Sequence, residues 1–319
     1  MIHTTGLTKT FSRGKATVEA VRDIDLHVKK GELVALLRPN GAGKSTTLRM
    51  LTTLLAPTSG SATVAGHSVT TERDAVRRNL GYVGQGNGGG HNQRVRDELI
   101  TQGLCYGLSK QQSGTRADEL LAALELSDLG RRTVSTLSGG QRRRLDIAIG
   151  LVHRPPLLFL DEPSTGMDPQ SRANLWEHIL RLRREMGTTI VLTTHYLDEA
   201  DSMAERVIVI DKGSVIADDT ADALKAELAG DLVTLTAESR DAAESLASIV
   251  GRLDLVRDVT VSGSRLNIRV ARAEKALPEL IRLSERHGIG IEAADMSRPT
   301  LDDVFLGLTG RSLRETAAA

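Results

Sequence analysis

The sequence predicts an α/β protein in which a parallel sheet carries a phosphate-binding loop, with a small α+β domain after it. A short apolar run, Val34–Leu37, leads into the glycine-rich segment Gly41–Gly43 and then into a helical pattern from Thr46 to Leu54. Two later apolar runs, Leu157–Leu160 and Thr189–Leu192, end beside polar residues. Continuous apolar runs of this length are typical of strands buried on both faces, as in parallel sheets.

Composition limits the classes of function. The chain has 319 residues, enough for two domains and a sizeable core. Lys+Arg and Asp+Glu both count 41, so the formal net charge is zero, and aromatic residues make up 2%. A surface for duplex nucleic acid normally brings a basic excess, and single strands need aromatic side chains on which bases stack. We therefore expect no nucleic-acid partner.

Cysteine usage and apolar run length predict a protein of a reducing compartment that does not cross a membrane by itself. Cys105 is the single cysteine and cannot form an internal disulfide, and no charged and apolar leader precedes the first predicted strand. Apolar runs such as Leu157–Leu160 are far short of the ~20 residues that a membrane-spanning helix requires.

The glycine-rich turn is the first candidate site. Its glycines let the backbone come close to a ligand, and the helix that follows presents the positive end of its dipole. Lys44 is placed to reach the outer phosphates and the Ser45 hydroxyl to bind Mg²⁺. The pattern G-x-x-x-x-G-K-[ST] is met at Gly43, Lys44 and Ser45, but Arg38 stands in place of its first glycine. Arg38 either interferes with the turn or points into solvent, and the sequence leaves both open.

Residues 1–30 are predicted to form antiparallel strands, because Ile24, Leu26 and Val28 alternate with polar residues. Phe11 lies upstream of the phosphate loop and is one of only three phenylalanines. Two interpretations of it stay open: the ring stacks on a purine base, or it packs under the first sheet.

A strand pair through 62–69, a short helix at 73–78 and a strand at 80–83 are predicted next. The last of these strands runs into Gln85 and a glycine-rich loop. The Gln85 side chain is placed to ligate Mg²⁺ or to hold an attacking water, in a loop whose glycines allow it to lie in or out of the site.

Residues 95–155 change character to helices, with the leucines of 117–126 on one helix face. Ser138, in the segment Leu137–Gln141, is placed as the N-cap of the next helix. The run Arg142–Arg144 lies in a first helical turn, where positive charge opposes the helix dipole, so either a carboxylate from elsewhere or the solvent must accommodate it. A solvated face is the usual explanation for such a run, and we expect one here.

Two apolar strands deliver ionisable side chains to the edge at which open α/β sheets bind ligands. Leu157–Leu160 leads into Asp161 and Glu162, and Thr189–Thr194 leads into His195. Asp161 is predicted to hold Mg²⁺, directly or through water, and Glu162 to polarise the attacking water. A histidine at a strand end is more often structural than catalytic, but this one ends a third strand of the same type.

A hairpin over 206–217 and a helix at 222–228 are predicted to close the first domain near Gly230. Beyond it, the predicted order of strand, helix, strand, strand, helix, strand is that of a ferredoxin-like split unit, with a short helix at the end. These elements are predicted at 232–236, 241–253, 256–261, 265–270, 275–287, 289–293 and 301–308. Because no phosphate loop, metal cluster or nucleophile constellation occurs in this part of the sequence, we interpret it as an interaction or regulatory domain.

Together these motifs resemble those of the ATP-binding subunits of ATP-binding-cassette (ABC) transporters. Leu137–Gln141 is similar to that superfamily's signature, and further elements follow in the family's order and approximate spacing. Those elements are residues 40–46, Gln85, Asp161–Glu162, Asp168 and His195. The resemblance implies a P-loop NTPase fold of ABC type with antiparallel β and helical subdomains. It implies an ATP-binding domain over 1–230, with the helical subdomain at about 95–155, and an accessory domain over 231–319.

The resemblance also implies two cassette domains in a head-to-tail pair, expected here to be a homodimer, that clamps ATP and Mg²⁺. His195 would contact the γ-phosphate, Asp168 would link the two sites, and the loop of Gln85 would sense a membrane-embedded partner. The nucleotide contacts so implied are Phe11, Asn40, Gly41, Ala42, Gly43, Lys44, Ser45, Thr46, Ser138, Gly139, Gly140, Gln141 and Asp168. Catalytic roles fall to Gln85, Glu162 and His195, and Mg²⁺ binding to Ser45, Gln85 and Asp161.

Two further segments, Thr193–Asp201 and Pro299–Gly310, are similar to the daunorubicin-resistance group of drug-exporter ATPases. Such subunits act at the cytoplasmic face of the membrane with a separate permease and export drugs, antibiotics or other hydrophobic compounds. The resemblance therefore implies an active export ATPase. Two alternatives stand beside it: an impaired or regulatory ABC protein in which Arg38 blocks the nucleotide, and a cassette ATPase that acts on nucleic acid or the ribosome, which the zero net charge disfavours.

Overall fold

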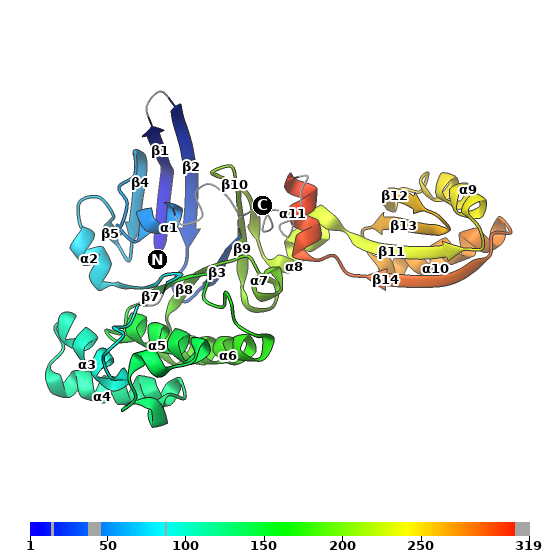
Figure 1. Cartoon of the computed structure of the whole chain (residues 1–319). Helices are drawn as coiled ribbons and strands as arrows, with labels where there is room; N and C mark the ends of the chain where they lie inside the picture. Colours follow the sequence, from blue (N-terminus) through cyan, green and yellow to red (C-terminus); the bar gives the residue numbers. More distant parts are fainter. Residues whose placement is uncertain (14–15, 38–45, 87, 310–319) are drawn as a thin grey trace. The chain divides into compact units, whose positions relative to one another are not determined.

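The computed structural model describes residues 1–13, 16–37, 46–86 and 88–309, and it divides into two compact units (Figure 1). The first unit consists of Met1–Tyr196 and Met203–Ala217. The second consists of Leu197–Ser202 and the chain from Asp218 onward. The boundary near Gly230 that the sequence suggests stays a proposal.

An antiparallel sheet opens the first unit. It contains β1 (Ile2–Arg13), β2 (Ala16–Val28), β4 (Ser59–Val64) and β5 (His67–Ser68), in the order β2-β1-β4-β5 (Figure 1). The antiparallel β subdomain expected from the alternating residues is thereby confirmed.

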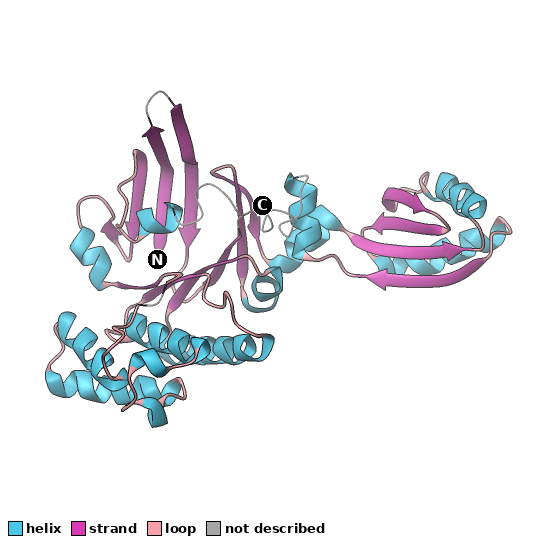
Figure 2. Ribbon diagram, viewed as in Figure 1, coloured by secondary structure: helices cyan, strands magenta, loops and turns pink. Residues whose placement is uncertain are grey.

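A second, six-stranded sheet forms the centre of the first unit; strands are magenta in Figure 2. Its strand order is β10-β9-β3-β8-β7-β6. Its strands are β3 (Leu33–Leu37), β6 (Leu80–Val83), β7 (Leu157–Asp161), β8 (Thr189–Thr194), β9 (Arg206–Asp211) and β10 (Ser214–Asp219). The pairs β9–β3, β3–β8, β8–β7 and β7–β6 are parallel. A turn with positive φ at Lys212 and Gly213 joins β9 to β10, as in a two-residue hairpin.

Every residue of β3, β7 and β8 is buried, because both faces of this sheet are covered. One face shares a core with the antiparallel sheet and with α1 (Thr46–Leu51). On the other face, α5 (Gly139–Leu151) and α6 (Pro169–Met186) pack their apolar residues against β7 and β8. The apolar runs were therefore interpreted correctly as buried parallel strands.

The remaining α-helices of the first unit lie in the segments before α5 and after β8. They are α2 (Arg73–Arg78), α3 (Val95–Cys105) and α4 (Lys110–Ala123), with α7 (Leu197–Met203) crossing into the second unit. Helix α4 begins before the predicted leucine face, because Ser109 and Gln112 form a capping box at its start. None of the described helices is long and apolar enough to cross a membrane.

Helix α6 was not predicted, although its ends carry clear signals. Asp168 caps it, Pro169 occupies its first turn, and Gly187 ends it with a left-handed backbone at φ 64°. Because Asp168 was considered only as a ligand, its capping role was missed.

The second unit contains a four-stranded antiparallel sheet, β12-β13-β11-β14, beside α9 and α10 (Figure 1). In chain order its elements are α8 (Ala221–Leu224), a π-helical turn (Lys225–Ala229), β11 (Asp231–Ala237), α9 (Arg240–Val250), β12 (Val256–Ser262), β13 (Arg265–Val270), α10 (Ala273–Arg286), β14 (Ile291–Ser297) and α11 (Leu301–Thr309). This order and pairing confirm the ferredoxin-like prediction. The last strand starts later than predicted, because the Ile289 N–H bonds back to the Ser284 carbonyl of α10.

Candidate functional site

Parallel register brings the predicted strand-end residues to one edge of the central sheet. Asp161 of β7 pairs with Thr193 of β8, and Val83 of β6 pairs with Leu160. Glu162 follows the first of these strands and His195 the second, and Gln85 follows β6. The three strands therefore deliver Gln85, the two carboxylates and His195 side by side.

Two hydroxyl groups hold the Asp161 carboxylate, which is buried. Thr193 Oγ1 donates to Asp161 Oδ1 at 2.6 Å, and the Tyr82 hydroxyl donates to Oδ2 at 3.3 Å. Burial, with a contribution from the Asp161 charge, raises the pKa of Tyr82 to about 12, so the phenol keeps the proton that it donates. Neither hydroxyl donor was foreseen from sequence.

Glu162 adopts an unusual backbone conformation at the strand end. Its φ is 48°, in the left-handed region that a residue with a Cβ enters at a cost. Its N–H donates to the carbonyl and the hydroxyl of Thr193, at 3.0 and 3.1 Å, which helps to fix this bend. The side chain remains 12% exposed, with Oε2 at 3.2 Å from Thr165 Oγ1 and 3.4 Å from His195 Nδ1.

A cavity of about 380 Å³ joins several of the predicted site residues. The predicted residues that line it are Gln85, Ser138, Gly139, Gly140, Glu162 and Asp168. Asp161 and His195 lie at the adjoining strand ends but are outside this lining. Asp168 accepts a bond from the Ser171 N–H at 2.9 Å, and hydrogen bonds with Ser171 lower the pKa of its carboxyl.

The signature segment forms the start of α5, and Ser138 caps it as predicted. Ser138 Oγ accepts from the Gln141 N–H at 3.3 Å, and Gln141 Oε1 accepts from the Ser138 N–H at 3.0 Å. This capping box occupies the Gln141 side chain, whereas Ser138 and Gly139 remain exposed. The exposed backbone at the beginning of a helix is suited to a phosphate.

The expected solvated face at Arg142–Arg144 is wrong for its first two residues. Arg142 and Arg143 are buried, and their guanidinium groups donate to backbone carbonyls of neighbouring segments. The positive charges therefore meet carbonyl oxygens rather than water. Arg144 is half-buried and lies 3.3 Å from Asn174 Oδ1.

Several predicted nucleotide-binding residues lie outside the described parts of the chain or away from the site cavity. Asn40, Gly41, Ala42, Gly43, Lys44, Ser45 and Arg38 lie outside the described residues. Thr46 is the first residue of α1 and is buried. Phe11 is 44% exposed on β1, with Lys9 Nζ 5.4 Å from its ring centre, so it does not pack under the first sheet. Its stacking on a base stays a prediction.

The residues present fit a metal ion that is shared with a phosphate group. Within the described parts of the chain, no group of three or more His, Cys, Asp or Glu side chains could hold a metal. Mg²⁺ in phosphate sites usually takes one or two protein ligands, with phosphate oxygens and water completing its shell. The buried Asp161 carboxylate, orientated by two hydroxyl donors, has the chemistry that such a site needs.

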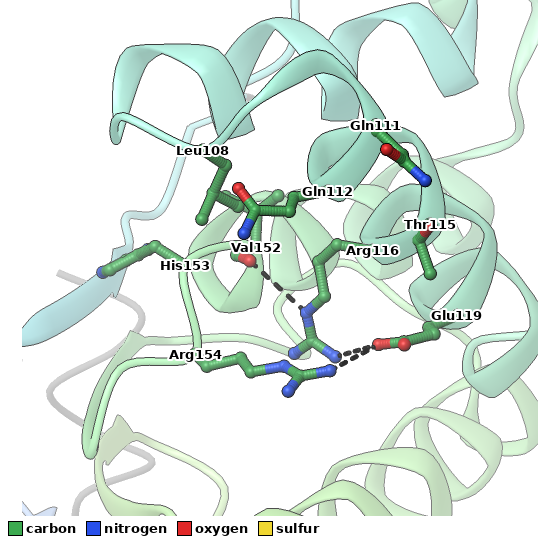
Figure 3. A pocket seen from close by; sticks show the side chains of 9 residues that line it. All are labelled: Leu108, Gln111, Gln112, Thr115, Arg116, Glu119, Val152, His153 and Arg154. Carbon is green, nitrogen blue, oxygen red and sulfur yellow. Dashed lines mark hydrogen bonds and ion pairs between the residues drawn. The ribbon is translucent and has the colours of Figure 1, made fainter.

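A second cavity, of about 500 Å³, lies between α4 and the segment after α5 (Figure 3). Arg116, which is buried, and Arg154 both reach Glu119 Oε2 at 2.9 Å, as the dashed lines show. Arg116 Nη2 and Nε also donate to the carbonyls of Leu151 and Val152. The charged groups of this cavity thus pair with one another, and no predicted site residue lines it.

Sequence comparisons match both units. The ABC transporter family matches residues 21–165, and the C-terminal domain of "ATP-binding protein DrrA1-3-like" proteins matches residues 220–309. The chain is 44% identical to the daunorubicin resistance ATP-binding protein DrrA3 of Streptomyces coeruleorubidus, over 94% of each chain. It is 42% identical to the daunorubicin/doxorubicin resistance protein DrrA of Streptomyces peucetius, over 99% of this chain and 96% of the relative. The linearmycin resistance ATP-binding protein LnrL of Bacillus subtilis is 36% identical, over 95% of this chain and 96% of the relative.

Solved structures of ATP-binding cassettes share the fold over about two thirds of the chain or more. A dimer of the cassette MJ0796, bound to ADP and Pi after hydrolysis, matches with a TM-score of 0.63 and 27% identity, over 69% of this chain and 98% of that one. The structure of cbiO1 from Clostridium perfringens matches with a TM-score of 0.64 and 26% identity, over 79% of this chain and 95% of that one.

Proposed function

The chain belongs to the ABC transporter family, in the group of daunorubicin- and doxorubicin-resistance ATP-binding proteins, and we propose that it powers an exporter through a separate membrane subunit. As a member of this family it is an ATPase of the ABC type. The names of its relatives, which refer to resistance to daunorubicin, doxorubicin and linearmycin, support drugs or antibiotics as the exported class. The permease would hold the chain at the cytoplasmic face of the membrane.

One observation carries the proposed hydrolysis. The Glu162 carboxylate, fixed by a left-handed backbone at the end of a parallel strand, lines the same cavity as Gln85 and the signature residue Ser138. In the proposed mechanism Glu162 polarises the attacking water, and Gln85 helps to position it. His195, 3.4 Å from Glu162, contacts the γ-phosphate and holds it in line with that water.

ATP and Mg²⁺ are the proposed cofactors. Residues 40–46 would bind the phosphates, with the Lys44 ammonium directed to the outer oxygens, and Asp161, Ser45 and Gln85 would hold Mg²⁺. When bound, Mg²⁺ neutralises charge that develops on the phosphate oxygens. The role of Asp161 is supported by its burial and by the two hydroxyl groups that orientate its carboxylate.

We infer that two copies of the chain form the working unit. The signature backbone at Ser138 and Gly139 is exposed, and it would complete the phosphate site of the second copy. The dimeric state of the MJ0796 cassette supports this arrangement. In such a pair Asp168, at the start of α6 and in the cavity of Ser138, would link the two sites.

Hydrolysis of Mg²⁺-ATP by the purified chain, beside its Arg38→Gly variant, tests the proposal and the impaired alternative together. Equal rates would mean that Arg38 is tolerated and that the chain is an active motor. Turnover by Arg38→Gly alone would favour a regulatory protein in which Arg38 disables the phosphate loop.

A further inference from the structure

Three side chains of α5 hold the loop around Gln85 on both sides. Arg143 Nη1 donates to the Gly84 carbonyl at 2.6 Å, immediately before Gln85. After it, Asp146 Oδ1 accepts from the Gly88 N–H at 3.0 Å, and Arg142 Nη2 donates to the Gly89 carbonyl at 2.9 Å. A loop rich in glycine is thus tied to the helix that begins with the signature.

Arg143 also binds the segment that contains the catalytic carboxylate. Its Nε donates to the Pro163 carbonyl at 2.7 Å, and its Nη2 lies 3.1 Å from the Asp161 carbonyl and 3.3 Å from the Glu162 carbonyl. The residue is 8% exposed. One rigid guanidinium therefore joins α5, the end of β6 and the end of β7.

Electrostatics alone gives no reason to bury this charge. Burial lowers the pKa of Arg143, while the carboxylates of Asp146 and Asp161 oppose that shift. Burying a charge costs free energy, and replacing a buried charged side chain by an apolar one of similar volume often leaves the stability of a protein unchanged or raises it. What a guanidinium offers instead is a planar fork of five donors with fixed directions, which a lysine cannot reproduce.

We propose that Arg143 is a positioning residue for ATP hydrolysis, which fixes Gln85 and the Glu162 backbone relative to the signature helix. The proposal rests on the hydrolytic function proposed above. Arg143 also lines the site cavity, but the hydrogen bonds that it makes to the described residues all go to backbone carbonyls, so its role here is to hold those segments in place. Since Ser138 begins the same helix, a phosphate bound at the signature is linked through Arg143 to Gln85 and Glu162.

The chain offers a matched control in Arg116. Arg116 is also buried and donates to backbone carbonyls, those of Leu151 and Val152 at the end of α5. It lines the other cavity (Figure 3) and is not among the residues that line the site cavity. Arg143→Met and Arg116→Met each remove a buried guanidinium and keep a long apolar side chain. We therefore expect both variants to lose stability, and only the first to lose positioning.

Three readouts on the full chain test the proposal: ATP affinity, the kcat and KM of hydrolysis, and amide hydrogen exchange over residues 84–91. Arg143→Met should bind ATP as the wild type does, exchange faster over 84–91, and lose about 100-fold in kcat, the scale of a misplaced catalytic group. Arg143→Lys, which keeps the charge without the fork, should also lose most of its kcat. Arg116→Met should keep the wild-type kcat and the wild-type exchange over 84–91.

Equal kcat losses in Arg143→Met and Arg116→Met would overturn the proposal, because they would reflect stability alone. Unchanged exchange over 84–91 in the Arg143 variants would also overturn it. If Arg143→Met does not fold, Arg143→Lys carries both tests. If the wild type fails to hydrolyse ATP, the proposed function fails, while the exchange comparison still tests whether Arg143 holds the Gln85 loop.

Discussion

Replacing Thr193 by valine probes how the site holds its buried carboxylate. Thr193 is 7% exposed, and its hydroxyl donates to Asp161 Oδ1 at 2.6 Å. Thr193 Oγ1 also accepts a hydrogen bond from the Glu162 N–H, but this N–H donates to the Thr193 carbonyl at 3.0 Å as well and would keep that partner in the variant. Valine keeps the shape of threonine, so the main loss is the donor to Asp161.

Hydrogen bonds to charged groups contribute about 1.5–3 kcal/mol, so Thr193→Val should lower the free energy of unfolding of the first unit by about 2 kcal/mol. Thr189→Val on the same strand is the matched control, because Thr189 Oγ1 accepts from the neutral Gly31 N–H at 2.9 Å. A bond between neutral groups contributes about 1 kcal/mol, and Thr189→Val should cost that amount.

Urea denaturation followed by fluorescence measures both variants. Trp176 is the single tryptophan, is 1% exposed and lies on α6, so its emission reports the first unit. Thr193→Ser keeps the hydroxyl and should retain most of the stability that Thr193→Val loses. The reasoning is refuted if Thr193→Val costs no more than Thr189→Val, since the bond to the carboxylate would then add nothing.

Three further predictions concern pH and the polar groups of the site. Burial lowers the pKa of His153 from 6.5 to about 4, so unfolding takes up a proton and stability is lost as pH falls through this window. At pH 5 that loss is about 2 kcal/mol, and His153→Gln should show a correspondingly weaker dependence on pH in urea denaturation. Tyr82→Phe removes the longer bond to Asp161 and should cost about 1 kcal/mol, less than Thr193→Val, by the same assay. Ser138→Ala removes the cap of α5 and should lower the free energy of unfolding in urea by about 1 kcal/mol. The same variant should form less of the ATP-bound dimer, as measured by light scattering.

Much of the fold was predictable because its signals are local. The buried strands ending at Leu37, Asp161 and Thr194 appear as apolar runs, and the cap at Ser138 appears as a serine before a helical pattern. The strand and helix order after Gly230 was enough to indicate the ferredoxin-like unit. These local patterns are reliable because they indicate directly which residues become buried and where a helix begins.

The contacts between segments were not predictable in the same way. In the sequence, Arg143 lies in a run of three arginines, and nothing local distinguishes a solvated face from a guanidinium that binds carbonyls far along the chain. The hydroxyl groups of Tyr82 and Thr193 meet Asp161 only after three strands are placed side by side. These hydrogen bonds depend on how neighbouring strands are aligned, and that register cannot be derived from a single sequence.

ATP binding and phosphate release by the wild type and Glu162→Gln, measured side by side, test the central claim most directly. We expect both proteins to bind Mg²⁺-ATP with similar affinity and only the wild type to release phosphate. Glutamine keeps the size of the side chain and removes its ability to accept a proton. Phosphate release by Glu162→Gln at the wild-type rate would contradict the role given to this carboxylate and, with it, the mechanism built on the site.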